Sequence, residues 1–101
     1  MPGVAFDAQL TLEDGADGQV DAVVTLVISN IGQEMLSLSA YASLPEFPRQ
    51  EQSVARLQGG DSVIRSFRFP AGGEVAREHA IRVGVREVNG PAGLNKLLMG
   101  Y

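Results

Sequence analysis

Strict alternation of apolar and polar residues, repeated along most of the chain, is the feature that most constrains the fold. In residues 4–13 every second side chain is apolar: Val4, Phe6, Ala8, Leu10 and Leu12. Successive side chains of a β-strand point to opposite faces of a sheet, so this pattern predicts a strand with one buried face and one wet face. A helix needs apolar residues three and four positions apart, and no segment shows that spacing convincingly. The sequence therefore predicts an all-β fold.

Other segments carry the same alternation. Residues 19–29 add apolar side chains on both faces, at Val23 and Val27 as well as on the main apolar face, which indicates a more central strand. Further strands are predicted over residues 35–42, 52–57, 62–69, 79–88 and 94–101.

Two polar residues share the apolar face of their strands. Arg65 has the parity of Val63 and Phe67, so we expect either a β-bulge or a position near the strand end. His79 has the parity of Ile81, and we expect it to face inward as a packed residue rather than as a catalytic group or metal ligand.

Turn-forming residues separate these segments. Residues 14–18, 29–33, 58–61 and 89–93 are rich in Gly, Asp and Asn and predict turns. Pro45 and Pro48 mark residues 43–50 as a crossing loop or a sheet edge, and residues 70–78 are predicted to form a loop. Asn30 suits an Asx turn or a left-handed conformation, and Gly32 tolerates a positive φ, so we predict that both lie in a connection at one end of the fold.

Seven to eight short strands at a spacing of roughly ten residues are typical of an antiparallel β-sandwich, with a small barrel as the alternative. The length of 101 residues fits one domain, and 45% hydrophobic and 20% charged residues are ordinary for a globular protein. The absence of cysteine rules out disulfides and thiolate chemistry. No apolar run approaches the ~18 residues of a membrane span, and the N-terminus has neither a basic segment nor a long apolar segment of a signal peptide.

Charge is unevenly distributed along the chain. The net charge is −4, but the seven acidic residues of the first 48 positions meet no basic residue there, whereas residues 49–101 carry an excess of bases. We expect the two halves to form neighbouring strands whose charges oppose each other, with a surface that orients a partner as the alternative. A net acidic chain with scattered bases is a poor candidate for binding nucleic acid.

Three short motifs follow one another along the chain: an Ile-x-Asn-x-Gly corner, a Leu-x-x-Gly-Asp-Ser turn and an alternating Ile-x-Val-x-Val strand. Their residues are Ile28, Asn30, Gly32; Leu57, Gly60, Asp61, Ser62; Ile81, Val83, Val85. This order of motifs resembles bacterial and archaeal immunoglobulin-like accessory domains of the CARDB and NEW3 type. The resemblance covers about residues 20–86 and lacks the usual family ending and the central Trp. What the resemblance implies is an immunoglobulin-like antiparallel β-sandwich spanning residues 1–101, serving as a non-catalytic module of a larger envelope or secreted protein. A cytoplasmic location stays open.

Chemistry-bearing motifs are scarce. No cysteine, nucleophile elbow or acid–base pair supports catalysis, so we expect no enzyme and no cofactor. The acidic hairpin around residues 13–21 offers Asp14, Asp17 and Asp21 as a weak calcium candidate. Its spacing does not follow the EF-hand pattern, and we favour a plain turn. The glycine pairs at 59–60 and 72–73 lack the residues of a phosphate loop and predict turns.

One predicted sheet face carries the candidate site. Tyr41 lies on the wet face of its strand with Ser37 and Ser39, and Arg82 and Arg86 would stand beside it if the strand over residues 79–88 is its neighbour. Such a face can bind a protein partner, a polar or anionic ligand, or carbohydrate. An ordinary solvated face is the simpler interpretation.

The aromatic residues bear on the carbohydrate alternative. The rings expected to be exposed for stacking on a sugar are those of Tyr41, Phe47 and Tyr101. We expect a protein-interaction module that works through this face or by strand addition at a sheet edge. A carbohydrate-binding module and a small carrier or chaperone-like domain are the alternatives.

Overall fold

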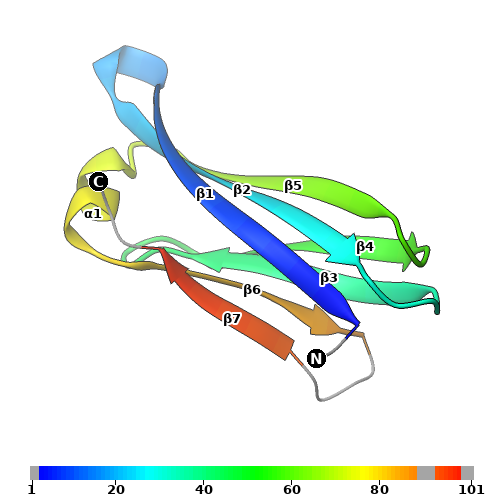
Figure 1. Ribbon diagram of the computed structural model, residues 1–101. Coiled ribbons are helices and arrows are strands. Elements are labelled where there is room, and N and C mark those ends of the chain that lie inside the picture. The colour runs from blue at the N-terminus through cyan, green and yellow to red at the C-terminus, as the bar shows by residue number, and fades with distance from the viewer. Residues whose placement is uncertain (1–2, 89–92, 99–101) are drawn as a thin grey trace.

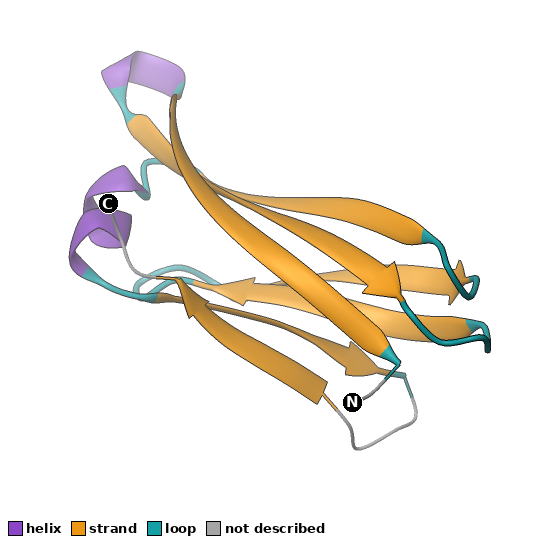
Figure 2. Cartoon of the chain, viewed as in Figure 1, coloured by secondary structure: helices purple, strands orange, loops and turns teal. Residues whose placement is uncertain are grey.

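The computed structural model describes residues 3–88 and 93–98 and consists of two antiparallel sheets packed face to face (Figures 1 and 2). The three-stranded sheet has the order β1-β2-β5 and the four-stranded sheet the order β4-β3-β6-β7. In chain order the elements are β1 (Val4–Asp14), η1 (Ala16–Gly18), β2 (Val20–Asn30), β3 (Leu36–Ser43), β4 (Gln50–Leu57), β5 (Ser62–Phe69), α1 (Gly73–Glu78), β6 (Ile81–Glu87) and β7 (Gly93–Leu98). The predicted all-β sandwich is confirmed, with seven strands.

The core lies between the two sheets and is built from the alternating apolar positions. Phe67 and Phe69 of β5, Leu26 of β2 and Ile81 of β6 are fully buried. Each such side chain contributes on the order of 1.5–3 kcal/mol through burial. The burial is less complete along one side, where Phe6 and Leu10 of β1 are only half buried against the core.

Connections between strands are found at the turns predicted from Gly, Asp, Asn and Pro. The β1–β2 hairpin contains Asp17 and Gly18 with φ of 55° and 73°, and the β4–β5 turn contains Gly60 with φ of 88°. The two prolines fall between Ser43, the last residue of β3, and Gln50, the first of β4. The predicted 89–93 turn falls largely on residues 89–92, and the predicted strand 94–101 ends on residues 99–101; these lie outside the described residues.

The prediction of a loop over residues 70–78 is wrong, because α1 occupies most of it. The helix packs Gly73 and Ala76 inward, and the His79 N–H donates to the Val75 carbonyl at its end. Six residues are too few to display a helical period, which is why the pattern was missed. The inward orientation predicted for His79 is also wrong: it follows α1 rather than belonging to β6, and it is exposed.

Neither explanation offered for Arg65 holds. The β2–β5 register runs without a shift, and Arg65 lies opposite Leu26 in mid-strand. Because β5 is an edge strand, the half-buried Arg65 side chain reaches across to β4, where its Nε and Nη2 donate to the Ser53 carbonyl at 3.4 and 3.3 Å. The inward-facing Arg65 is tolerated because its guanidinium lies at the open edge between the two sheets and hydrogen-bonds to β4 there.

The same edge is closed by two glutamines of β4. Gln50 Nε2 donates to the Arg68 carbonyl at 2.7 Å, and Gln52 Nε2 donates to the Ser66 carbonyl. These side chains occupy the outward carbonyls of β5 that an added strand would otherwise use. Among the described residues, no helix has the length and apolar character needed to cross a bilayer.

Candidate interaction surface

The outer face of the four-stranded sheet brings the sequence-predicted site residues together. β3 pairs with β6, and in this register Ser39 lies opposite Arg86, Tyr41 opposite Gly84 and Ser43 opposite Arg82. The neighbourhood expected of β3 and the strand over residues 79–88 is therefore found. We call this surface the four-stranded face, defined by Ser37, Ser39, Tyr41, Arg82 and Arg86.

The tyrosine at the centre of this face is covered. Only 8% of Tyr41 is exposed, and the Arg49 guanidinium lies 3.9 Å from its ring centroid. Arg49 Nη2 also pairs with Glu51 Oε1 at 3.2 Å, which holds the cation over the ring. The expectation that Tyr41 is an exposed ring is therefore wrong, because a residue from the β3–β4 connection folds over it.

The structure does not show the other two rings, of Phe47 and Tyr101, as exposed surfaces for sugar stacking. Phe47 is half buried and packs edge-to-face on Phe69, with centroids 5.8 Å apart and planes at 78°. Tyr101 lies outside the described residues. No Phe or Tyr side chain in residues 3–88 and 93–98 is exposed.

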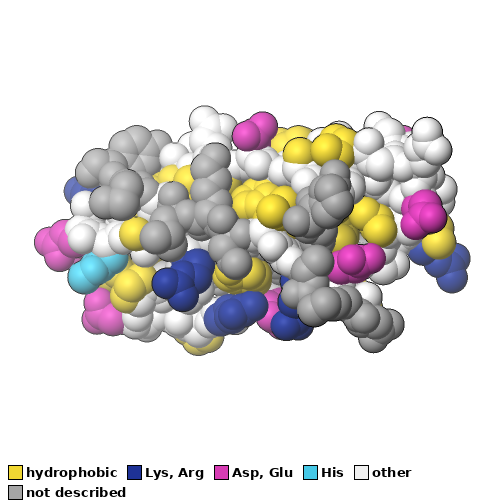
Figure 3. Space-filling model, turned by 60° about the horizontal axis from the view of Figure 1, so that its bottom comes forward, with side chains coloured by type: hydrophobic (Ala, Val, Ile, Leu, Met, Phe, Trp, Pro, Cys, Tyr) yellow, Lys and Arg dark blue, Asp and Glu magenta, His cyan; other side chains and the backbone are white. Residues whose placement is uncertain are grey.

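Positive charge gathers on the four-stranded face although the protein as a whole is acidic. Arg82 and Arg86 are exposed, and within the described residues neither forms an ion pair. Glu51 on the same face is neutralised by Arg49. Figure 3 shows several dark blue side chains in the lower half of the view, with magenta ones among them. Charge of a sign opposite to that of the whole molecule is suited to orienting an anionic partner.

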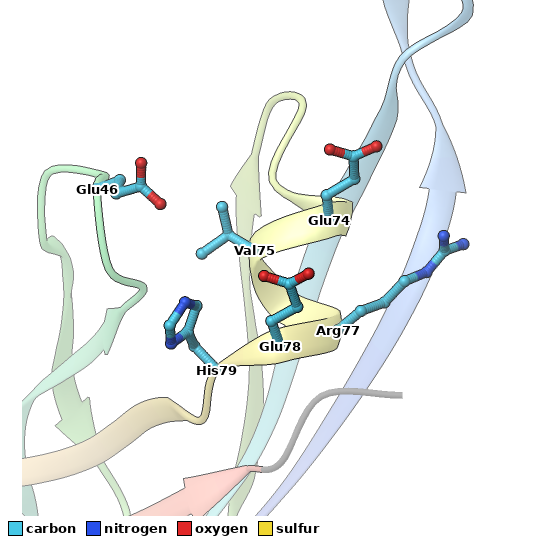
Figure 4. Close-up of a pocket in the computed structure, with 6 residues that line it drawn as sticks. All are labelled: Glu46, Glu74, Val75, Arg77, Glu78 and His79. Atoms are coloured by element: carbon cyan, nitrogen blue, oxygen red, sulfur yellow. The ribbon is translucent and has the colours of Figure 1, made fainter.

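Two hollows lie at the end of the sandwich that carries α1. Arg82 lines one of about 290 Å³ together with Ser43, Pro45 and Ala80. The second, of about 550 Å³, is lined by Glu46 of the β3–β4 connection and by residues of α1 and its end (Figure 4). In Figure 4, Glu46 faces the helix across the hollow, and the Arg77 side chain extends away from Glu46.

The acidic hairpin does not assemble the calcium candidate. Asp21 is 5% exposed and accepts hydrogen bonds at 2.7 Å from Arg68 Nε and from the Ala71 N–H, whereas Asp14 and Asp17 are exposed. The Ala71 hydrogen bond lowers the pKa of Asp21, and Arg68 lowers it further against the opposing effect of burial. Within the part of the chain that is described, no group of three or more acidic, His or Cys residues is placed to hold a metal.

Asp21 is instead a structural residue that the sequence analysis missed. It fixes Ala71, a non-glycine residue with φ of 59°, at the start of the connection to α1. The same Arg68 also pairs with Glu13 at 3.3 Å. These contacts join acids of the first half to a base of the second, as the charge distribution predicted, but at a corner rather than along a whole sheet.

The turn after β2 is a buried polar junction. Asn30, 1% exposed, donates through Nδ2 to the Glu34 and Leu57 carbonyls at 2.7 and 2.9 Å, and its Oδ1 accepts the Gly32 N–H at 3.0 Å. This is an Asx turn at one end of the sandwich, as predicted, although Asn30 itself is the last residue of β2 and only Gly32 lies in the connection. The positive φ expected for Gly32 is not found; its part is to supply the N–H.

Comparison with known protein families and with curated proteins finds no match for this sequence.

Proposed function

We propose that this chain is a non-catalytic protein-interaction module and that it binds its partner through the four-stranded face. The observation that carries the proposal is the β3–β6 register, which places two exposed arginines beside two serines on one surface of an acidic protein. Cations on a sheet face give an on-rate advantage and specificity towards a partner of opposite charge.

Binding by a face is favoured over strand addition at β5. The glutamines of β4 already occupy the Ser66 and Arg68 carbonyls of that edge. β4 itself ends in an irregular pairing with β3, where Arg56 has φ of 56° and its N–H donates to Ser37 Oγ at 3.2 Å. Bulges of this kind blunt an edge against further pairing.

The proposal extends to a larger bacterial envelope or secreted protein of which this chain is an immunoglobulin-like domain. The division into a three-stranded and a four-stranded sheet supports an immunoglobulin-like assignment. In constant-type immunoglobulin domains the fourth strand belongs to the sheet of the first, second and fifth strands, whereas here β4 pairs with β3. The full-length gene tests this part: we expect an export signal and neighbouring domains. A gene that begins at Met1 and ends at Tyr101 would count against it.

A carbohydrate-binding module is less well supported, because such sites stack sugars on exposed rings. Tyr41, the ring at the centre of the four-stranded face, is covered by Arg49.

Photo-crosslinking tests the face itself. A benzoylphenylalanine is placed at Ser39 in the full-length parent protein, in its native host, and the matched control carries it at Thr25 on the outer face of the three-stranded sheet. Both positions are half buried. We expect a discrete protein adduct from Ser39 that Arg82→Ala with Arg86→Ala removes. Equal adducts from Thr25, or an adduct indifferent to both arginines, would refute the assignment of the face.

A further inference from the structure

We propose that the partner presents an extended acidic segment to the four-stranded face, with two carboxylates four residues apart seated on Arg82 and Arg86. This inference rests on the proposed function and names the chemistry of the partner. It follows from the spacing of the two arginines, from their surroundings, and from the lack of an ion pair to either arginine among the described residues.

The spacing matches an extended peptide. Arg82, Gly84 and Arg86 follow one another on the outer face of β6, so the Cα atoms of the two arginines are separated by four residues of strand. At about 3.3 Å per residue this is about 13 Å. In an extended peptide, residues i and i+4 also point to the same side at about 13 Å, so two carboxylates with that spacing reach both guanidinium groups together.

The position between the arginines accommodates the middle of such a segment. Gly84 is buried and has no side chain, so no side chain of β6 itself stands between the two guanidinium groups. Tyr41 lies opposite Gly84 in the β3–β6 register, and the Arg49 guanidinium lies over its ring.

Each arginine also has a hydroxyl nearby. Ser39 lies opposite Arg86 and Ser43 opposite Arg82 in the β3–β6 register. Arg82 and Ser43 in addition share the hollow of about 290 Å³, which gives one carboxylate a recess rather than a flat surface. Guanidinium groups bind carboxylates in a planar, two-bond arrangement, and a hydroxyl donates a further hydrogen bond.

Charge selects an acidic segment over other partners. The single glutamate among the described side chains of this face, Glu51, is held by Arg49 and does not oppose an incoming carboxylate. A basic segment would meet two exposed arginines and be repelled. An anionic polysaccharide shares the charge, but its carboxylates recur at intervals set by the sugar rings and not by the rise of an extended peptide along β6, so we commit to a peptide.

An NMR titration of the isotope-labelled protein tests the inference. The probe is a capped nine-residue Thr/Val peptide with two glutamates four residues apart, and the control peptide has the same composition with the glutamates adjacent. We expect amide shifts confined to β3 and β6. We also expect Kd about fivefold lower for the spaced peptide, and binding weakened between about 50 and about 300 mM salt.

Protein variants supply the second comparison. Arg82→Gln with Arg86→Gln should raise Kd for the spaced peptide about tenfold. Arg77→Gln, an exposed arginine on α1, should leave Kd unchanged. Gln keeps much of the side chain of Arg, and both sites are exposed, so folding is expected to survive; the dispersion of the amide spectrum verifies this.

Several outcomes overturn the inference: equal affinity for both peptides, no binding of the spaced peptide at millimolar concentration, or no effect of the double variant. Tighter binding of an oligouronate of equal charge would assign the face to polysaccharide instead. If the Ser39 adduct still forms in cells while the peptides fail, the proposed function stands and only the acidic segment is lost. If the adduct fails, the face assignment itself falls.

Discussion

Replacing Asn30 by Ala is expected to destabilise the protein more than any other single substitution in the turns that connect the strands. The substitution removes three hydrogen bonds: two join Asn30 to Gly32 and Glu34 in the β2–β3 connection, and one joins it to Leu57 at the end of β4. The side chain is 1% exposed, so water does not readily replace the lost partners of Leu57 and Gly32. The backbone bonds of Asn30 with Gly60 and Asp61 remain.

The magnitude follows from the count of bonds. Each intramolecular hydrogen bond contributes about 1 kcal/mol net, and a buried group left unsatisfied costs about 1–3 kcal/mol. Three bonds therefore give a loss of about 3 kcal/mol. With a urea m-value of about 1.5 kcal/mol/M, the unfolding midpoint falls by about 2 M.

Urea unfolding followed by far-ultraviolet circular dichroism measures this loss. Gln33→Ala is the matched control, because Gln33 lies exposed in the same connection and should change stability by less than about 0.5 kcal/mol. Asn30→Asp keeps the acceptor for Gly32 but turns a carboxylate towards two carbonyl oxygens, so it should not rescue stability. A loss below about 1 kcal/mol for Asn30→Ala, at unchanged m-value, would refute the view of Asn30 as the junction of this end of the sandwich.

Three further predictions concern the Asp21 corner, the turn at Gly59 and the Arg49 side chain on the four-stranded face. The pKa of Asp21 is lowered from 3.8 in the folded state, so its contribution to the free energy of unfolding is complete above about pH 5 and is lost as pH falls through the folded pKa. The difference in free energy of unfolding between the protein and Asp21→Asn, measured by urea unfolding, should therefore become smaller from pH 5 towards pH 2. A difference that stays constant over this range would contradict the prediction. Gly59→Ala should lower the free energy of unfolding by about 1–3 kcal/mol, because the new Cβ would lie 2.7 Å from two backbone carbonyl oxygens. Gly32→Ala is the control: its Cβ would meet ordinary contacts at 3.6 and 3.8 Å, and stability should hardly change. Equal thermal midpoints for both variants would show that the turn relaxes around Gly59. Arg49→Ala should lower the free energy of unfolding by about 0.5–1 kcal/mol, because it uncovers the Tyr41 ring. Arg49→Lys keeps a cation and should lose less stability than Arg49→Ala. Unchanged urea midpoints in both variants would show that the stacked guanidinium does not stabilise the fold.

The alternation of side chains was enough to predict the strands, their inward faces and the sandwich. Each of these depends on a two-residue period that is local to the segment, as in residues 62–69, where the predicted and observed strands coincide. Asn30 was also predictable, because an Asx turn is made within three residues. The candidate face followed in the same way once a neighbourhood of two strands was assumed.

The tertiary structure alone decided the pairings between distant segments. Sequence alternation does not say that β4 joins β3 rather than β5, nor that the edge of β5 is then closed by Gln50 and Gln52. Arg65 was misassigned for this reason, since its partner Ser53 lies on the other sheet. Asp21 and Arg68 meet across 47 positions, and Arg49 reaches Tyr41 only because the β3–β4 connection folds back. Such contacts depend on which surfaces the packed sheets bring together, and no local period carries that information.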